Sequence, residues 1–127
     1  MAAVTPNSDR AASKSGQTLR YYGTGAANQA DTMTSTAVAE HKSYKIAFVS
    51  CVYSAAPTQA GVTVTLDSGL GSGYDALLTT GSANALATVY VPDGDVILFP
   101  GDAVLVTSPA GGVGLTAAMT IVLEAMV

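Results

Sequence analysis

The chain has 127 residues, a net charge of −4 and a charged fraction of only 11%, against about 25% in an ordinary soluble domain. Its five basic residues all lie at or before Lys45, so the rest of the chain cannot supply the Lys/Arg stripe that phosphate binding needs, and nucleic-acid binding is excluded there. A surface with so few charges is poorly protected against association, and we expect much of it to be covered by partners.

The first 36 residues differ in composition from the rest. Residues 1–36 are rich in Ala, Ser, Thr, Asn and Gln and carry few large apolar side chains. Such a segment cannot bury enough apolar surface to fold alone, so we expect an extended N-terminal arm that is either disordered or ordered by a partner. Arg20–Tyr22 is the exception and fits a short edge strand. The basic residues of this arm suit contact with an acidic surface, and residues 37–127 are left as the folded domain.

Two features predict folding in a cytoplasm. Residues 1–20 lack the apolar run of a secretory signal. Cys51 is the single cysteine, so no disulfide can form within the chain.

The segment 44–54 predicts a long strand because it is dense in β-branched and aromatic residues. In a regular strand, Ile46, Phe48 and Val52 share one face. The opposite face is apolar as well and carries Ala47, Val49, Cys51 and Tyr53. We therefore expect this strand to be covered on both sides.

Six further segments have the alternation or composition of short strands, and residues typical of turns separate them. In chain order they are 62–67, 74–80, 85–91, 96–99, 103–107 and 115–127. Pro100–Asp102 predicts a hairpin turn between the fourth and fifth of these. The last contains good helix formers, but its strict alternation and the lack of a capping box favour a strand.

Residues 103–123 carry no charge and are long enough to be weighed as a membrane span. Pro109 and the glycines that follow it predict a turn in the middle of this stretch, and so two strands joined by a loop. The whole pattern predicts an all-β fold, an antiparallel β-sandwich or jelly roll of seven or eight strands with an extended N-terminal arm.

No candidate for catalysis or cofactor binding has the pattern its chemistry requires. Gly69, Gly71 and Gly73 do not fit a dinucleotide fingerprint, which needs its third glycine three positions after the second, where Tyr74 stands. They predict a hairpin loop. His41 is the single histidine, which is too few for a histidine-based metal site. We expect it to lie on the surface ahead of a strand. Cys51 lies among apolar neighbours and predicts a small buried side chain rather than a reactive thiolate. We expect no enzyme activity, no catalytic residue and no cofactor.

The sharpest polar cluster is Asp93, Asp95 and Asp102, which lie in two predicted turns. Calcium takes carboxylate and carbonyl oxygens from such turns. Aspartate also favours turns simply by accepting hydrogen bonds from its own backbone, and we expect the second role and no metal site.

The run 46–127 resembles the small β-sandwich virion proteins of tailed bacteriophages, that is, head-decoration (cement) proteins and related fibre or spike modules. The residues that carry the resemblance are Gly61–Asp67, the glycine-rich turn into Tyr74–Asp75, Val91–Asp95, Phe99–Asp102 and the alternating last strand. The resemblance implies a homotrimer on the capsid surface of a virion assembled in the host cytoplasm. It also implies that the N-terminal arm binds the major capsid protein or another virion protein, with no membrane or nucleic acid involved.

Two functions are therefore expected from the sequence. The first is a structural capsid-decoration protein that stabilises the assembled head. The alternative is a receptor- or glycan-binding head or spike module of a phage fibre, which would use Tyr74, Tyr90 and the loops 93–95 and 111–114.

Overall fold

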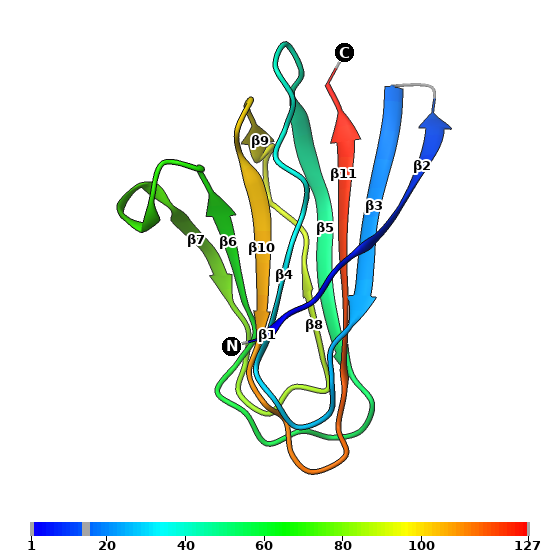
Figure 1. Ribbon diagram of the computed structural model, residues 1–127, viewed down its shortest axis with the longest axis vertical. Helices are drawn as coiled ribbons and strands as arrows, with labels where there is room; N and C mark the ends of the chain where they lie inside the picture. The colour runs from blue at the N-terminus through cyan, green and yellow to red at the C-terminus, as the bar shows by residue number, and fades with distance from the viewer. Residues whose placement is uncertain (1, 14–15, 127) are drawn as a thin grey trace.

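Two β-sheets pack face to face to form the protein (Figure 1). The structure is a computed structural model that describes residues 2–13 and 16–126, with side chains for residues 2–8 and 18–126. The predicted all-β sandwich is confirmed. Within the described ranges, no helix has the length and apolarity that crossing a membrane would take.

The first sheet has five strands. In spatial order they are β1 (Ala2–Ala3), β4 (Asp31–Thr34), β10 (Ala103–Ser108), β6 (Thr63–Asp67) and β7 (Ala76–Thr80). Strands β1 and β4 pair in parallel, and the other neighbours are antiparallel. A single 3-10 turn, Ser72–Tyr74, lies between β6 and β7.

The second sheet has six strands. In spatial order they are β2 (Asn7–Ser13), β3 (Gly16–Thr24), β11 (Ala117–Ala125), β5 (Tyr44–Tyr53) and β8 (Ala87–Tyr90), while β9 (Ile97–Leu98) also pairs with β5. All pairings in this sheet are antiparallel. The long central pair of β5 and β11 forms the axis of the sandwich.

All seven strands predicted between residues 44 and 127 are present, as β5 to β11. The uncharged stretch 103–123 forms β10 and most of β11 with a loop between them, as expected. The described residues hold eleven strands rather than seven or eight because the first 34 residues add four more.

The expectation of an N-terminal arm is wrong for these residues. Seven consecutive residues of β3 pair with β11, and Tyr21 is buried in the core at 8% exposure. The strand is not at an edge either, since β2 covers its other side. A segment that cannot bury enough surface alone becomes ordered here by pairing with strands distant in sequence, and a boundary at residue 36 would cut through both sheets.

The turn at Pro100–Asp102 is confirmed, but it does not close a hairpin. The amide of Asp102 donates to the carbonyl of Phe99 at 2.9 Å, and Gly101 has φ 93°, which is the geometry of a type II turn with proline first. The strands on either side belong to different sheets, since β9 pairs with β5 and β10 pairs with β4 and β6. The turn therefore carries the chain from one sheet to the other.

A β-bulge in β5 changes the predicted faces of that strand. Ile46 pairs with Leu123, but the next paired residue is Phe48, opposite Val122, so Ala47 is an extra residue. The alternation shifts by one at this point, and Ile46 joins the core face with Val49. The expected cover on both sides is also wrong, because none of the eleven described strands lies over the outer face.

The core lies between the two inner faces. The alternation predicted for the last strand is confirmed by the burial of Ala117, Met119, Ile121 and Leu123. That of 62–67 is confirmed by Val62 and Val64, each 1% exposed. The largest fully buried residues from other strands are Met33, Val49, Leu98, Val104 and Val106.

Candidate interaction surfaces

The residues that sequence reasoning weighed for chemistry do not converge. His41 is exposed in the loop before β5, as expected. Asp95 lies 3.9 Å from the ammonium of Lys45, whereas Asp102 accepts from the amide of Phe99 at 2.9 Å within its own turn. Throughout the described ranges, no three His, Cys, Asp or Glu side chains are close enough to hold a metal ion together.

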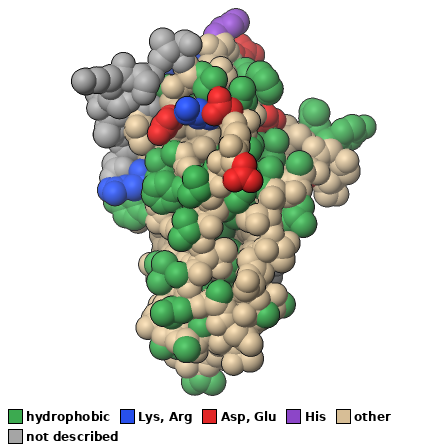
Figure 2. All heavy atoms as spheres, turned by 180° about the vertical axis from the view of Figure 1, so that it is seen from behind, with side chains coloured by type: hydrophobic (Ala, Val, Ile, Leu, Met, Phe, Trp, Pro, Cys, Tyr) green, Lys and Arg blue, Asp and Glu red, His purple; other side chains and the backbone are tan. Residues whose placement is uncertain are grey.

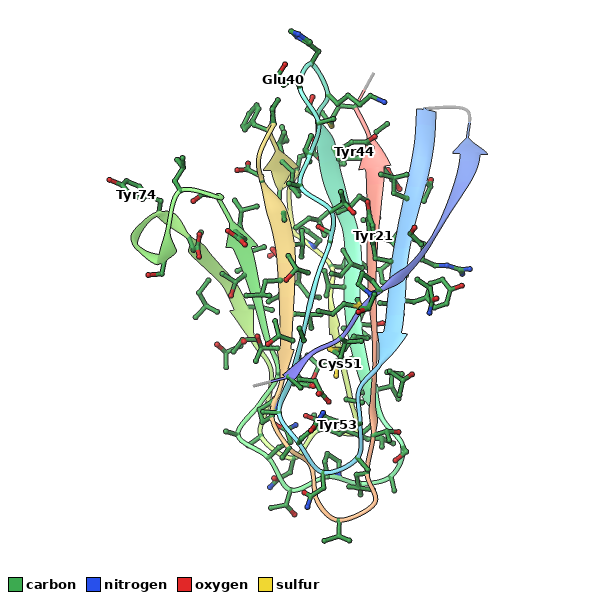
Figure 3. All side chains as sticks on the ribbon, in the orientation of Figure 1. Tyr21, Glu40, Tyr44, Cys51, Tyr53 and Tyr74 are labelled. Atoms are coloured by element: carbon green, nitrogen blue, oxygen red, sulfur yellow. The ribbon has the colours of Figure 1, made fainter. Side chains whose placement is uncertain are left out.

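Cys51 is a buried thiol, as expected, and is 1% exposed (Figure 3). Burial away from water raises its pKa from 9.0 to about 11, and the charge of Asp31 adds to the effect. Burial likewise raises the pKa of Tyr53 to about 12, with further contributions from Cys51 and Asp31. Such a thiol stays protonated at neutral pH and is a poor nucleophile.

A buried polar pair escaped the sequence analysis. Asp31 and Ser108 lie opposite each other on β4 and β10 and are 1% and 0% exposed. Gln29 donates to Asp31 Oδ1 at 3.0 Å, while Asp31 Oδ2 and the Ser108 hydroxyl have no hydrogen-bond partner among the described residues. Neither residue stands out in the sequence, because each lies in a segment with ordinary turn or strand composition.

The loops proposed for a glycan site lie apart. Loop 93–95 is next to Lys45 at the start of β5, through the ion pair of Asp95. Loop 111–114 is at the other end of β5, where the amide of Thr58 donates to Gly111 and the Tyr53 hydroxyl donates to Pro109. Tyr90 is on strand β8 and packs against the core rather than lying in a loop. The two loops and Tyr90 therefore do not form one site.

The outer face of the six-stranded sheet is largely apolar and open to solvent. We call its five exposed large apolar residues the outer patch: Tyr22, Phe48, Val52, Val89 and Val91, at 39%, 37%, 42%, 63% and 63% exposure. Figure 2 shows this face, with hydrophobic side chains gathered below a small group of charged ones. Sequence reasoning missed the outer patch because it expected β5 to be covered on both sides.

The outer patch has a charged border. Arg20 stacks on the ring of Tyr22, with its guanidinium carbon 5.2 Å from the ring centre. At the other side, Lys45 lies between Asp95 and Glu124, at 3.9 and 3.8 Å. Asp93 lines the same shallow surface hollow as these three residues. Three carboxylates against one ammonium make this end of the face acidic.

The connection between β6 and β7 is a second exposed apolar feature, confirmed as a glycine-rich hairpin loop. Figure 3 shows Tyr74 at its end, pointing away from the sandwich. We call residues 68–75 the β6–β7 tip; within it Leu70 and Tyr74 are each 73% exposed.

Hydrogen bonds within the β6–β7 tip hold its backbone despite its glycines. The amide of Ser68 donates to Asp75 Oδ1 at 3.0 Å, and the amide of Tyr74 donates to the carbonyl of Gly71 at 3.0 Å. Gly69 and Gly71 have φ 75° and 108°, which other residues rarely adopt. The tip therefore presents its two apolar side chains from a defined backbone.

Comparison with known proteins finds only weak likenesses, to solved structures. No family model and no curated protein matches the chain. A structure of CBM4 aligns over 84% of this chain and 83% of its own, at 10% identity and a TM-score of 0.37. The low-affinity xylan-binding module CBM86 from the gut symbiont Roseburia intestinalis aligns over 97% of this chain and 88% of its own, at 15% identity and a TM-score of 0.34.

Proposed function

We propose that the chain is a non-catalytic structural protein that binds a larger protein shell and copies of itself, in the manner of the phage head-decoration proteins that its sequence resembles. One observation carries the proposal: the outer patch leaves five large apolar side chains in water on one sheet face. Contiguous apolar surface of this kind is a liability in a free monomer and is typical of a protein-binding face.

The chemistry of the outer patch restricts its partner. A sheet face is broad and gently twisted, so it suits a partner surface that is also broad rather than a single inserted side chain. The apolar centre provides the main free energy of association, since removing it from water is favourable. The acidic border of Asp93, Asp95 and Glu124 favours a shell surface that carries lysine or arginine at the matching position.

The mechanism is passive and follows from mass action. A protein that binds the assembled shell but not its free subunits shifts the equilibrium toward the shell. No bond is made or broken, and no catalytic group is required. The N-terminal segment contributes as part of both sheets rather than as a free arm, so attachment depends on the folded surface.

Re-addition to heads tests the proposal. Heads purified on a density gradient and depleted of this chain are titrated with the wild-type chain and with V52K, which places a charge in the outer patch. We expect saturable wild-type binding at a fixed ratio to the major shell protein. We expect V52K to bind at least about tenfold more weakly, as for an interface residue whose loss costs over 1 kcal/mol.

The matched control is T65K, which places the same charge on the outer side of the five-stranded sheet, opposite the buried Val64. It should bind as the wild type does. Absence of wild-type binding to depleted heads would reject the decoration proposal, and equal weakening by both lysines would reject the assignment to the outer patch.

A second candidate is glycan binding at the same face, favoured by the two aromatic residues of the outer patch. Tyr22 and Phe48 lie on β3 and β5, on either side of β11, and exposed rings on a flat face can stack on sugar rings. A glycan array with the wild type and F48A tests it. Binding of the wild type to specific glycans that F48A no longer binds would support glycan binding over shell binding.

A further inference from the structure

A pocket of single-ring size is lined by residues of β3, β5, β11 and the segment between β4 and β5, none of which belongs to the β6–β7 tip. It lies over the inner face of the six-stranded sheet, beyond the point where β4 ends at Thr34. Its floor is formed by side chains of three strands of that sheet, namely Leu19, Tyr21, Leu123 and Tyr44. The segment between β4 and β5 forms its rim.

The volume of this pocket limits what it can hold. It measures about 140 Å³, close to the ~150 Å³ of an apolar cavity that accepts a benzene molecule. The rim includes Ala37 and Ala39, two small exposed side chains that leave the mouth open, and Lys42. One aromatic ring fits such a space, and Tyr21 and Tyr44 are among the residues that would surround it.

We propose that this pocket receives the Tyr74 side chain of a second copy of the chain, so that copies associate tip to pocket. The inference rests on the self-association in the proposed function and names the surfaces that carry it. Tyr74 has the right size, is 73% exposed, and is held on a backbone with few conformations to lose on docking. Leu70 beside it would cover the rim.

The charges of the two surfaces are complementary. Asp67 and Asp75 flank the tip, and both accept hydrogen bonds within it. The pocket carries Lys42 at its rim. This matches the uneven charge of the whole chain, in which every basic residue lies at or before Lys45. Opposite charges at the two surfaces speed and orient encounter, and added salt should weaken association.

The fold places the two surfaces so that a molecule cannot fill its own pocket. The tip joins β7, the outermost strand of the five-stranded sheet, and its Tyr74 points away from the sandwich (Figure 3), whereas the pocket is lined by β3, β5 and β11 of the other sheet. Each copy therefore offers a tip and a pocket that are built from different residues. This is a head-to-tail interface, which closes into a ring when the rotation between copies allows.

Two variants, each blocking one half of the contact, test the inference. Y74A removes the ring and A39W fills the pocket from its exposed rim; circular dichroism and thermal melting confirm that each folds. Sedimentation velocity should show the wild type as an oligomer and each variant as a monomer, with an affinity loss of about a hundredfold, as for a central interface residue.

Mixing the two variants gives the sharpest result. A39W keeps its tip and Y74A keeps its pocket, so an equimolar mixture should form a one-to-one dimer and nothing larger. V113A is the control, since Val113 is 91% exposed in loop 111–114, at the end of β5 away from the pocket residue Tyr44, and it should assemble as the wild type does.

The outcomes separate the inference from the proposed function. A wild-type oligomer that both variants preserve would overturn the tip-to-pocket contact and leave self-association intact. Variants that lose assembly but form no dimer on mixing would overturn it as well. A wild-type chain that is monomeric at all concentrations would overturn self-association and with it the tip-to-pocket contact. Tyr74 would then serve another protein or a glycan. Binding to heads would remain a separate measurement.

Discussion

Gly25 and Asp31 show how closely single residues are fitted in this sandwich. Gly25 is buried, and a Cβ at this position would overlap the carboxylate of Asp31, with the Asp31 Cβ only 3.0 Å away. The Asp31 side chain has no room to move aside, since it is 1% exposed. The glycine is therefore required for space rather than for an unusual backbone angle.

We expect G25A to lower the free energy of unfolding by about 1–3 kcal/mol, as overpacking of a tight interior does. Urea titration followed by circular dichroism measures it. G73A is the control, because a Cβ at Gly73 meets nothing within 4 Å, and it should leave stability nearly unchanged. Equal stability of G25A and the wild type would contradict the packing described for Asp31.

The raised pKa values of Cys51 and Tyr53 predict a loss of stability in alkali. Both groups are neutral in the folded chain up to higher pH than in the unfolded chain. Their contribution is complete below pH 9 and is lost as pH rises, from 9.0 to about 11 for Cys51 and from 10.0 to about 12 for Tyr53. The shift of Cys51 corresponds to up to about 3 kcal/mol, at ~1.4 kcal/mol per pKa unit.

Urea titrations at pH 8, 9, 10 and 11 measure this effect. The variant C51A should lose less stability than the wild type between pH 9 and pH 11, because its unfolded state has no thiol to ionise. A thiol reagent at pH 7 should label the wild type only after unfolding. Parallel stability curves for the two proteins would show that the buried thiol has no part in the alkaline loss.

At the scale of elements, the two halves of the chain differ in how well the sequence predicts them. Strands from β5 to β11 are rich in β-branched residues and alternate, so local pattern was sufficient. Strands β2 and β3 are rich in small and polar residues. Strand β3 depends on pairing with β11, more than ninety positions away, and β2 depends in turn on β3; the pairing of β3 with β11 has no local signal. The bulge at Ala47 likewise adds one residue without a mark in the sequence.

The candidate surfaces were also only partly predictable from the sequence. Tyr74 was recognisable as a loop aromatic. The outer patch was not, since the apolar residues Phe48 and Val52 look like core until the partner sheet is seen to cover only one side. Asp31 and Ser108 become neighbours only through the pairing of β4 with β10, which the N-terminal composition did not indicate.

Deleting residues 1–30 should abolish the fold rather than merely detach an arm. It removes β3, and with it Tyr21 from the core and one complete side of β11. We expect the truncated chain to lack a cooperative thermal transition in circular dichroism. Deletion of residues 1–3 is the control, since it removes only the two-residue pairing of β1 with β4. A cooperative transition after the longer deletion would restore the arm model.

At the scale of the molecule, the sandwich exposes large apolar side chains and has too few surface charges to prevent copies from associating through them. The outer patch and the β6–β7 tip lie on different sides, and together they hold seven exposed large apolar residues. Neither is part of the core, and the folded chain gains nothing from them in isolation. Association gives both a role, one toward a shell and one toward the next copy.

The mass of the wild-type chain in solution tests this account most directly. Light scattering after size exclusion, from micromolar to millimolar concentration, should show one closed oligomer of constant mass, with three copies expected from the phage resemblance. A chain that stays monomeric over the whole range would contradict the claim that its exposed apolar surfaces serve self-assembly.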